Sequence, residues 1–418
     1  MAQGPILIFD KSLLHALNVD ESVWLDNFFL SNITPLFYIE TLADLEKSVA
    51  KGRTPEQVVG SLAYKTPDLQ SHPAIHHDTL LMGELAGAGE VIMDGRILMA
   101  GGTPVALDGK KGVLYSKTPE AEAFDRWGKH EFLDIERQIA KLWRRALTGL
   151  DHTKFYSALQ WKFKGNKPKA LADVKALVDA DIDQPNQRKA LELGMAVLEI
   201  RTDLQAQVIA RWESAGKPPI RTFAPYFTHM ASVDYFFYLG IAADLIGTER
   251  PAGKVDNKVD LAYLYYLPFC MVFASCDKLH ARIVPLFLRD DQTFVDGREL
   301  KADLRKLDEH FARLPEEERA SGLFKFAGDP PDDNSFLVTR LWNKHFPPGW
   351  RQRRMLHEPL SKEASDALIE QINRLEKDGV PLPPSERVHP DAYDFAQVSR
   401  SIRAQKGKWM RVPPEAIK

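Results

Sequence analysis

Ile6-Leu7-Ile8-Phe9-Asp10, near the start of the chain, is a short apolar run that ends at an acid. An apolar run without alternation is typical of a strand that is covered on both faces, as in a parallel sheet. Ligands bind beyond the carboxyl ends of such strands, so an acid that directly follows one tends to face a binding site. The pattern predicts a parallel α/β sheet with Asp10 at its functional edge.

Other segments with the same character surround this first strand. Helices and strands alternate at short intervals, first near the N-terminus and again much later in the chain, which is typical of a doubly wound α/β sheet. The segments with helical spacing are 12–17, 22–30, 38–50 and 255–266. The segments with strand character are 6–9, 32–37, 269–275 and 283–288. We therefore expect an α/β/α sandwich with a mostly parallel sheet.

A long stretch of different character separates the two halves of this pattern. Residues 50–120 are rich in Gly, Pro and His, with a possible hairpin at 91–105, and helical patterns follow at 130–147 and 186–212. We expect a core that is split by a largely helical insertion and followed by a helical extension. The expected parts are 1–50 (N-terminal half of the core), 51–225 (insertion), 226–305 (C-terminal half of the core) and 306–418 (charged, helical, Pro-rich extension).

The overall composition excludes some classes of protein and leaves others open. With 44% hydrophobic and 27% charged residues in 418, the chain is expected to be globular, and its net charge of −3 creates no global attraction for nucleic acid. Two cysteines in one apolar segment predict no disulfide framework and favour the cytoplasm. The longest apolar stretch, 261–274, is too short to span a membrane and contains Pro268.

Carboxylates recur at the positions where a parallel sheet would bring them together. Asp10 follows the first expected strand and Asp277 follows 269–275, while two further pairs of acids are spaced four apart on expected helices. Those pairs are Glu40 with Asp44 and Asp256 with Asp260. Two carboxylates 4 Å apart repel by about 4 kcal/mol at an effective dielectric near 20, so such a group favours a bound cation. Oxygen ligands favour Mg²⁺ or Mn²⁺.

These segments resemble parts of the PIN-domain nucleases. Ile6 to Leu14 resembles their first strand and acid, 34–45 their second strand and acidic helix, and 257–262 with Asp277 their closing pair of acids. By this resemblance the metal ligands are Asp10, Glu40, Asp260 and Asp277, with Asp44 and Asp256 as substitutes and the hydroxyls of Ser12 and Ser275 in support. The resemblance covers 5–48 and 230–300, and PIN domains usually lack so long an insertion between their halves.

The resemblance implies a metal-dependent endonuclease that acts on RNA more readily than on DNA. Each acid also has a simpler interpretation, because an Asp after a strand commonly caps a helix, and Glu40 with Asp44 can form the solvated face of one. The order of the acids along the chain, rather than any single residue, favours the metal site.

Two other clusters have candidate roles. The basic residues near 340–354 alternate with Trp342, Phe346 and Trp350, a mixture suited to contacts with nucleic acid or with the protein's own acidic surface. These basic residues are Arg340, Lys344, Arg351, Arg353 and Arg354. A second cluster holds His72, His76, His77 and Asp78, but Pro73 interrupts any helix that would align His72 with His76 on a metal. We expect structural or surface histidines there.

Two alternatives to the nuclease remain. A haloacid-dehalogenase-like phosphatase also begins with an Asp after an apolar strand, but it needs a second Asp where Ser12 stands. The other is a catalytically silent scaffold or regulatory protein whose inserted helices bind a protein partner. Stabilisation by Mn²⁺ that depends on the acids would favour the nuclease over the scaffold.

Overall fold

The computed structural model describes most of the chain. The described residues are 4–43, 45, 52–139, 159, 163, 167–247, 258–355, 361–383, 386, 390–398 and 402–412. Asp44 and Asp256, the two substitute ligands of the sequence analysis, lie outside them. In the described part of the chain, no helix is long and apolar enough to cross a membrane.

A five-stranded parallel sheet forms the centre of the molecule. Its strands are β1 (Ile6–Phe9), β2 (Leu30–Ile33), β3 (Ser71–Pro73), β6 (Val272–Ser275) and β7 (Thr293–Asp296). They lie in the order β3-β2-β1-β6-β7, and every neighbouring pair is parallel. From β1 the chain adds β2 and β3 on one side of the sheet, and it later adds β6 and β7 on the other side. The gap between β1 and β6 is therefore the switch point, where ligands bind in such sheets. The prediction of a mostly parallel α/β sheet is confirmed.

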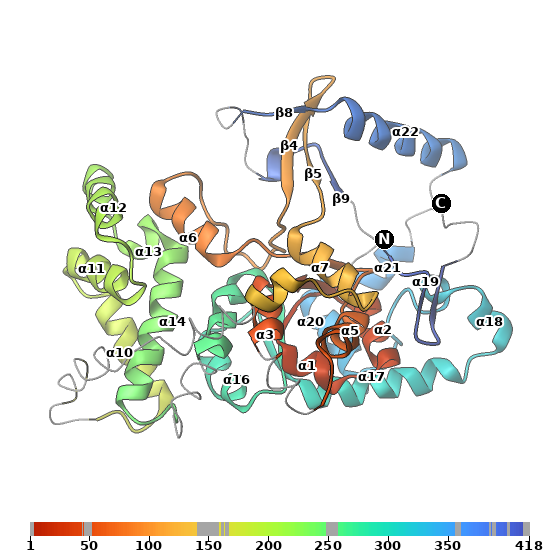
Figure 1. Ribbon diagram of the computed structural model, residues 1–418, viewed down its shortest axis with the longest axis horizontal. Helices are drawn as coiled ribbons and strands as arrows, with labels where there is room; N and C mark the ends of the chain where they lie inside the picture. Colours follow the sequence, from red (N-terminus) through yellow and green to blue (C-terminus); the bar gives the residue numbers. More distant parts are fainter. Residues whose placement is uncertain are drawn as a thin grey trace.

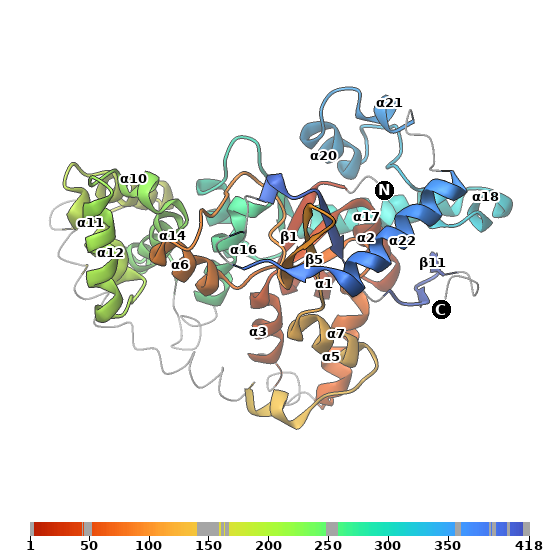
Figure 2. The same ribbon diagram turned by 90° about the horizontal axis from the view of Figure 1, so that it is seen from above.

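Helices cover both faces of this sheet (Figures 1 and 2). Ile6 and Ile8 of β1 belong to one hydrophobic cluster, whereas Leu7 and Phe9 belong to the other, as the alternation of side chains along a strand requires. The second cluster includes α1 (Lys11–Ala16), α2 (Val19–Phe28), α5 (Pro55–Lys65), α7 (Pro119–Gly128), α17 (Gly297–Ala312) and α20 (Leu337–His345). The first cluster includes α6 (His77–Ala86), α14 (Pro225–Ala242), the 3-10 helix η2 (Tyr263–Phe269) and α16 (Lys278–Ile283).

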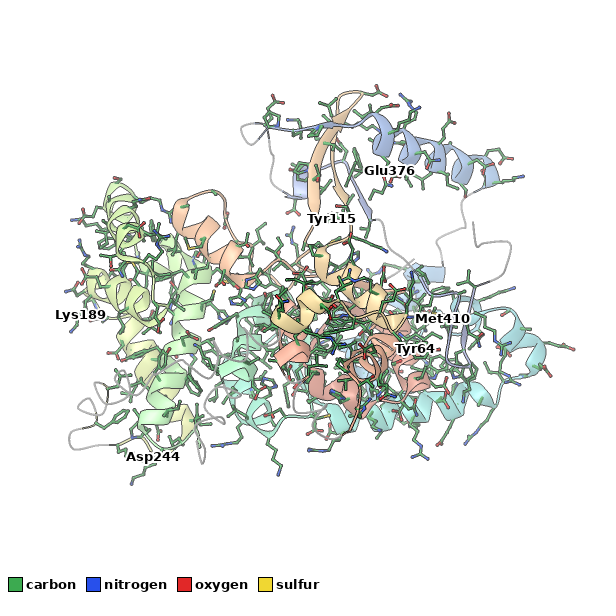
Figure 3. The ribbon with its side chains drawn as sticks, viewed as in Figure 1. Tyr64, Tyr115, Lys189, Asp244, Glu376 and Met410 are labelled. Carbon is green, nitrogen blue, oxygen red and sulfur yellow. The ribbon has the colours of Figure 1, made fainter. Side chains whose placement is uncertain are left out.

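A helical subdomain lies at one end of the molecule, away from the sheet (Figure 1). It is built around α14 from α10 (Leu171–Ile182), α11 (Gln187–Val197), α12 (Thr202–Ser214) and α13 (Ile220–Phe223). The single helix expected over 186–212 is wrong, because Glu199 takes a left-handed conformation (φ 51°) that ends α11 before α12 begins. Figure 3 places Lys189 of α11 and Asp244 in this subdomain.

The C-terminal extension returns to earlier parts of the chain. Its strands β8 (Val380–Pro381) and β9 (Phe395–Val398) flank the hairpin of β4 (Gly102–Leu107) and β5 (Lys110–Tyr115) in a second sheet. Another short hairpin, β10 (Gln405–Lys406) and β11 (Met410–Arg411), packs on α2, with Met410 buried in the core (Figure 3). The remaining elements are α3 (Pro35–Ala43), η3 (Val284–Leu286), α18 (Glu316–Ala320), α19 (Leu323–Phe326), α21 (Trp350–Met355), α22 (Lys362–Asp378) and η5 (Pro390–Ala392).

Further expectations about the elements differ from the structure. The second strand, expected at 32–37, is β2 and ends at Ile33, because α3 begins at Pro35. The strand expected at 283–288 is wrong, because this segment forms α16 and η3, and the fifth strand is β7. The first hairpin turns at Asp108 and Gly109, both with positive φ, rather than within 91–105. Finally, β3, α5 and α7 belong to the core although they lie in the segment assigned to the insertion, so the core extends farther along the chain.

Candidate active site at the switch point of the sheet

Asp10 lies directly after β1 and is buried, with 3% of its surface exposed. It caps α1, because its Oδ1 accepts a hydrogen bond from the Leu13 amide at 3.1 Å, and Ser12 Oγ donates to the same carboxylate at 2.8 Å. Burial alone would raise the pKa of Asp10, but the hydrogen bond and charge of His280 and the hydroxyls of Ser275 and Ser12 outweigh it and lower this pKa. Asp10 is therefore held as an anion.

Ser275 joins the two halves of the core at this point. Its Oγ donates to Asp10 Oδ2 at 2.8 Å across 265 positions of sequence, and it contacts His280 Nδ1 at 2.8 Å. The Asp277 amide also donates to Ser275 Oγ at 2.9 Å, and the Cys276 amide donates to Ser12 Oγ at 3.0 Å. Both serines predicted to support Asp10 thus bond to it directly and connect the ends of β1 and β6.

His280 is one of the residues of this site that the sequence analysis missed. Since Ser275 Oγ gives its proton to Asp10, it accepts one from His280 Nδ1, and His280 Nε2 faces the Asp260 carbonyl oxygen at 2.7 Å. Both ring nitrogens therefore donate, and the ring is an imidazolium 3.4 Å from Asp10 Oδ2. Burial would lower the pKa of His280, but the hydrogen bond and charge of Asp10 raise it to about 9.

This ion pair predicts a pH-dependent stability. The folded-state pKa of His280 lies above its ordinary value of 6.5, so its contribution is complete below pH 6.5 and is lost as the pH rises through about 9. We expect the free energy of unfolding of His280→Asn, measured with urea in EDTA, to fall less than that of the parent between pH 6.5 and 9.5. His130→Asn, at an exposed position, is the control. An unchanged pH dependence in His280→Asn would contradict the ion pair.

Glu40 lies on α3 and contributes to the same site. Lys11 Nζ lies 3.2 Å from Glu40 Oε1 and donates to the Glu40 carbonyl at 3.2 Å, while the Tyr263 hydroxyl donates to Oε2 at 2.8 Å. Burial raises the pKa of Glu40. The charge of Lys11 lowers this pKa in part, and the charge of Asp10 raises it further. Glu40 is thus held inside the site rather than on a solvated helix face.

Asp260 has the least favourable electrostatic environment of the four acids. Burial raises the pKa of Asp260 well above its ordinary value, His280 counteracts this, and the charges of Glu40, Asp277 and Asp10 raise it further. The four acids predicted from sequence therefore lie close enough to disturb one another. Among the described residues, none donates a hydrogen bond to the Asp260 carboxylate or forms an ion pair with it.

Asp277 caps α16 at the end of β6. Its Oδ1 accepts hydrogen bonds from the Leu279 and His280 amides, so the capping role considered for such an acid is also present. Capping uses one carboxylate oxygen and does not exclude a cation at the other.

The donor set suits a hard cation, although the four acids are not drawn tightly together. All the donors are carboxylate or hydroxyl oxygens, the ligands that Mg²⁺ and Mn²⁺ prefer. Within the described ranges, three ligand atoms from different residues lie within 4.8 Å of one another only at His76, His77 and Asp78, and not at the four acids. Here Lys11 and His280 supply positive charge beside Glu40 and Asp10.

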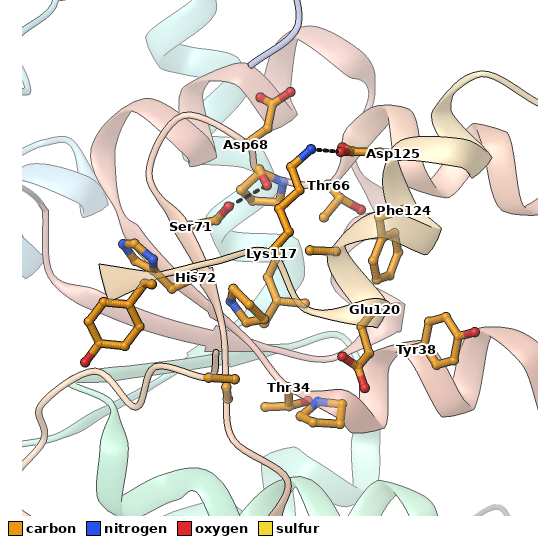
Figure 4. Close-up of a pocket in the computed structure, with 18 of the residues that line it drawn as sticks. Thr34, Tyr38, Thr66, Asp68, Ser71, His72, Lys117, Glu120, Phe124 and Asp125 are labelled. Atoms are coloured by element: carbon orange, nitrogen blue, oxygen red, sulfur yellow. Dashed lines mark hydrogen bonds and ion pairs between the residues drawn. The ribbon is translucent and has the colours of Figure 1, made fainter. Parts of the chain in front are cut away.

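A separate pocket lies beyond the ends of β2 and β3 (Figure 4). It spans about 880 Å³, a volume that includes space open to bulk solvent, and the four acids do not line it. Tyr38 and Phe124 form part of its wall, Lys117 pairs with Asp125, and the buried Oγ1 of Thr34 has no hydrogen-bond partner in the described part of the chain. Its acids outnumber its bases, so it does not suit a phosphate.

The basic residues near 340–354 lie on α20 and α21, and most contact the protein itself. Lys344 donates to the Gln292 carbonyl, and Arg351 and Arg354 donate to carbonyls at 328–331 and pair with Asp332 and Asp329. Arg340 and Arg353 are more peripheral and donate to nearby carbonyls of their own segment. Trp342 and Trp350 are buried, so neither offers a free face for stacking on bases.

Comparisons with known proteins identify no relative: the chain matches no family model, no curated protein and no solved structure. The geometry at the switch point is therefore the basis on which a function can be proposed.

Proposed function

We propose that this chain is a metal-dependent endonuclease with a PIN-like core. It would use Mg²⁺ or Mn²⁺ to hydrolyse phosphodiester bonds in nucleic acid, in RNA more readily than in DNA. The observation that carries the proposal is the hydrogen bond of 2.8 Å between Ser275 Oγ and Asp10 Oδ2, because it brings two acidic segments 265 positions apart to the switch point of a parallel sheet. The raised pKa of Asp260 supports it, since crowded buried carboxylates without a cation are costly.

The acids divide into two roles. Asp260, without a hydrogen-bond donor in the described residues, and Asp277, which caps its helix with one oxygen, would hold the cation, with Asp10 and Glu40 completing the ligand set. When bound, such a cation lowers the pKa of a water ligand and neutralises charge on the phosphodiester.

The other polar residues orient these acids. Ser12 and Ser275 fix the Asp10 carboxylate, and the Tyr263 hydroxyl fixes one oxygen of Glu40. Lys11 and His280 reduce the repulsion between the acids and place positive charge beside the site, where it would attract a phosphate. Contact with more distant phosphates is proposed for Arg340 and Arg353, which donate to nearby carbonyls of their own segment and pair with no acid among the described residues.

Cleavage of labelled RNA and labelled single-stranded DNA tests this proposal. We expect the parent to cleave with Mn²⁺ and not with EDTA, and Asp277→Asn to lose cleavage because Asn keeps the helix cap but not the charge. Asp173→Asn is the matched control, since Asp173 accepts hydrogen bonds from the Lys169 and Ala170 amides at the start of α10, in the helical subdomain. Cleavage that survives both EDTA and Asp277→Asn would contradict the proposal.

A catalytically silent scaffold is the second candidate, in which the inserted helices bind a protein partner. It is favoured by one observation, that Asp10 and Glu40 are already neutralised by His280 and Lys11 of the same chain. Only the nuclease predicts that Mn²⁺ raises the melting temperature of the parent but not that of Asp277→Asn.

A further inference from the structure

His76, His77 and Asp78 form a second cluster of metal-binding side chains, at the start of α6. The imidazole rings of His76 and His77 stack with their centroids 4.4 Å apart. Asp78 reaches both, with Oδ2 3.5 Å from His76 Nδ1 and Oδ1 3.6 Å from His77 Nε2. One ligand atom from each of the three residues lies within 4.8 Å of the others.

Tyr266 of η2 determines which nitrogen of His77 carries the proton. The Tyr266 hydroxyl donates its only proton to the Ile75 carbonyl at 3.1 Å and accepts from the His77 amide at 2.9 Å. It can therefore only accept from His77 Nδ1, which lies 3.4 Å away, so Nδ1 is protonated and Nε2 carries a lone pair. A hydrogen bond from the distal nitrogen to an oxygen is how proteins orient a histidine that binds metal.

The arrangement places two electron-pair donors opposite each other. His77 Nε2 and Asp78 Oδ1 are 3.6 Å apart, too far for a hydrogen bond, and a lone pair facing a carboxylate is repulsive unless a cation or a water molecule bridges them. His76 Nδ1 accepts only a long bond of 3.3 Å from the Asp78 amide, which a cation would replace.

We propose that His76, His77 and Asp78 bind a divalent transition metal of the zinc class. Two imidazole nitrogens and one carboxylate oxygen suit Zn²⁺ and leave a fourth position for water or another ligand, whereas Mg²⁺ prefers oxygen ligands alone. The site is separate from the four acids and different in chemistry, so it does not depend on the proposed nuclease function.

The cluster lies where a bound metal would link several parts of the fold. At one end of α6, the cluster contacts η2 through Tyr266, and η2 also carries Tyr263, which bonds to Glu40. Farther along α6, Glu84 accepts hydrogen bonds from the Tyr226 and Phe227 amides at the start of α14. A metal here would hold together the sheet, the candidate active site and the helical subdomain.

Titration of metal-free full-length protein tests the proposal, with Zn²⁺ affinity measured against a chromophoric chelator and Co²⁺ binding by visible absorption. We expect one Zn²⁺ per chain at this site and a loss of affinity of at least about 100-fold in Asp78→Asn and in His77→Gln, because losing a ligand costs more than losing a residue that only orients one. Asp78 is exposed, so its substitution serves even if His77→Gln fails to fold.

Two controls separate the outcomes. His130→Asn, at an exposed histidine outside the cluster, should bind Zn²⁺ like the parent, and so should Asp260→Asn, which removes a ligand of the proposed nuclease site. Parent protein that binds no Zn²⁺, or Asp78→Asn and His77→Gln that both bind as tightly as the parent, would overturn the inference. A protein that binds Zn²⁺ as expected but does not cleave nucleic acid would contradict only the proposed function of the four acids.

Discussion

Asp260→Asn is expected to reduce Mn²⁺-dependent cleavage on the order of 1000-fold while leaving the metal-free protein as stable as the parent, or more stable. The two effects have one cause. Burial and the charges of Glu40, Asp277 and Asp10 raise the pKa of Asp260, so its carboxylate is costly to ionise in the folded protein. Asn resembles the neutral acid, which removes this cost and the proposed metal ligand together.

The pH dependence results from the same shift. The pKa of Asp260 in the folded state is raised above its ordinary value of 3.8, so the folded state keeps this proton to a higher pH than the unfolded state does. The folded state therefore loses stability as the pH rises above 3.8 towards the raised pKa. In EDTA, we expect the stability advantage of Asp260→Asn over the parent to grow with pH. Urea unfolding between pH 5 and 8 measures it, with Asp290→Asn, an exposed acid, as the control.

Two results would contradict this interpretation of Asp260. One is a metal-free Asp260→Asn protein that is less stable than the parent at every pH, which would mean that the ionised carboxylate is stabilised rather than crowded. The other is unchanged Mn²⁺-dependent cleavage, which would remove Asp260 from the ligand set.

Lys406→Met is expected to lower the free energy of unfolding by about 3–5 kcal/mol. Lys406 of β10 is fully buried, its Nζ donates to the Thr66 carbonyl at 2.9 Å, and it lies 3.6 Å from Asp26 and 3.9 Å from Asp68. Burial raises the pKa of Asp68 to about 6 even with this ammonium beside it. Removing the buried cation would leave Asp26 with hydrogen bonds from backbone amides but without an opposite charge, and Asp68 with Arg403 alone. It would also detach the C-terminal hairpin from the core.

The matched control is Lys408→Met, two residues along the same hairpin. Lys408 also contacts an acid, Asp308, at 2.8 Å, but about half of its side chain is exposed, so its loss should cost about 1 kcal/mol or less. Urea unfolding at pH 7 compares the two. Equal losses for Lys406→Met and Lys408→Met would mean that burial does not set the strength of the Lys406 contacts.

The sequence predicted those parts of the fold whose signals are local. β1 is an apolar run of four residues, all buried, and its sandwiched position followed from that run alone. β3, Ser71–Pro73, contains no such run and becomes a strand only because β2 offers its free edge, which no local pattern reveals. The segment 283–288 has an apolar pattern but forms no strand, because its apolar residues pack on the core as the end of a helix and a 3-10 turn.

The residues of the candidate site were likewise predictable only where their signals are local. The positions of Asp10, Glu40, Asp260 and Asp277 after strands or on helices indicated that they would meet, and each of the other three shifts the pKa of Asp260. Lys11, Tyr263 and His280 were not foreseen, because their roles depend on contacts between distant segments. His280 had one signal, its position three residues after Asp277 in the helix that follows β6.

Anomalous scattering at the manganese edge, from a crystal soaked in Mn²⁺, tests most directly the central claim that acids from both halves of the chain hold one cation. We predict an anomalous peak bounded by Asp260, Asp277 and Asp10, and no such peak in crystals of Asp260→Asn. A map with no peak at the ends of β1 and β6, from crystals in which Mn²⁺ is bound elsewhere, would contradict the claim.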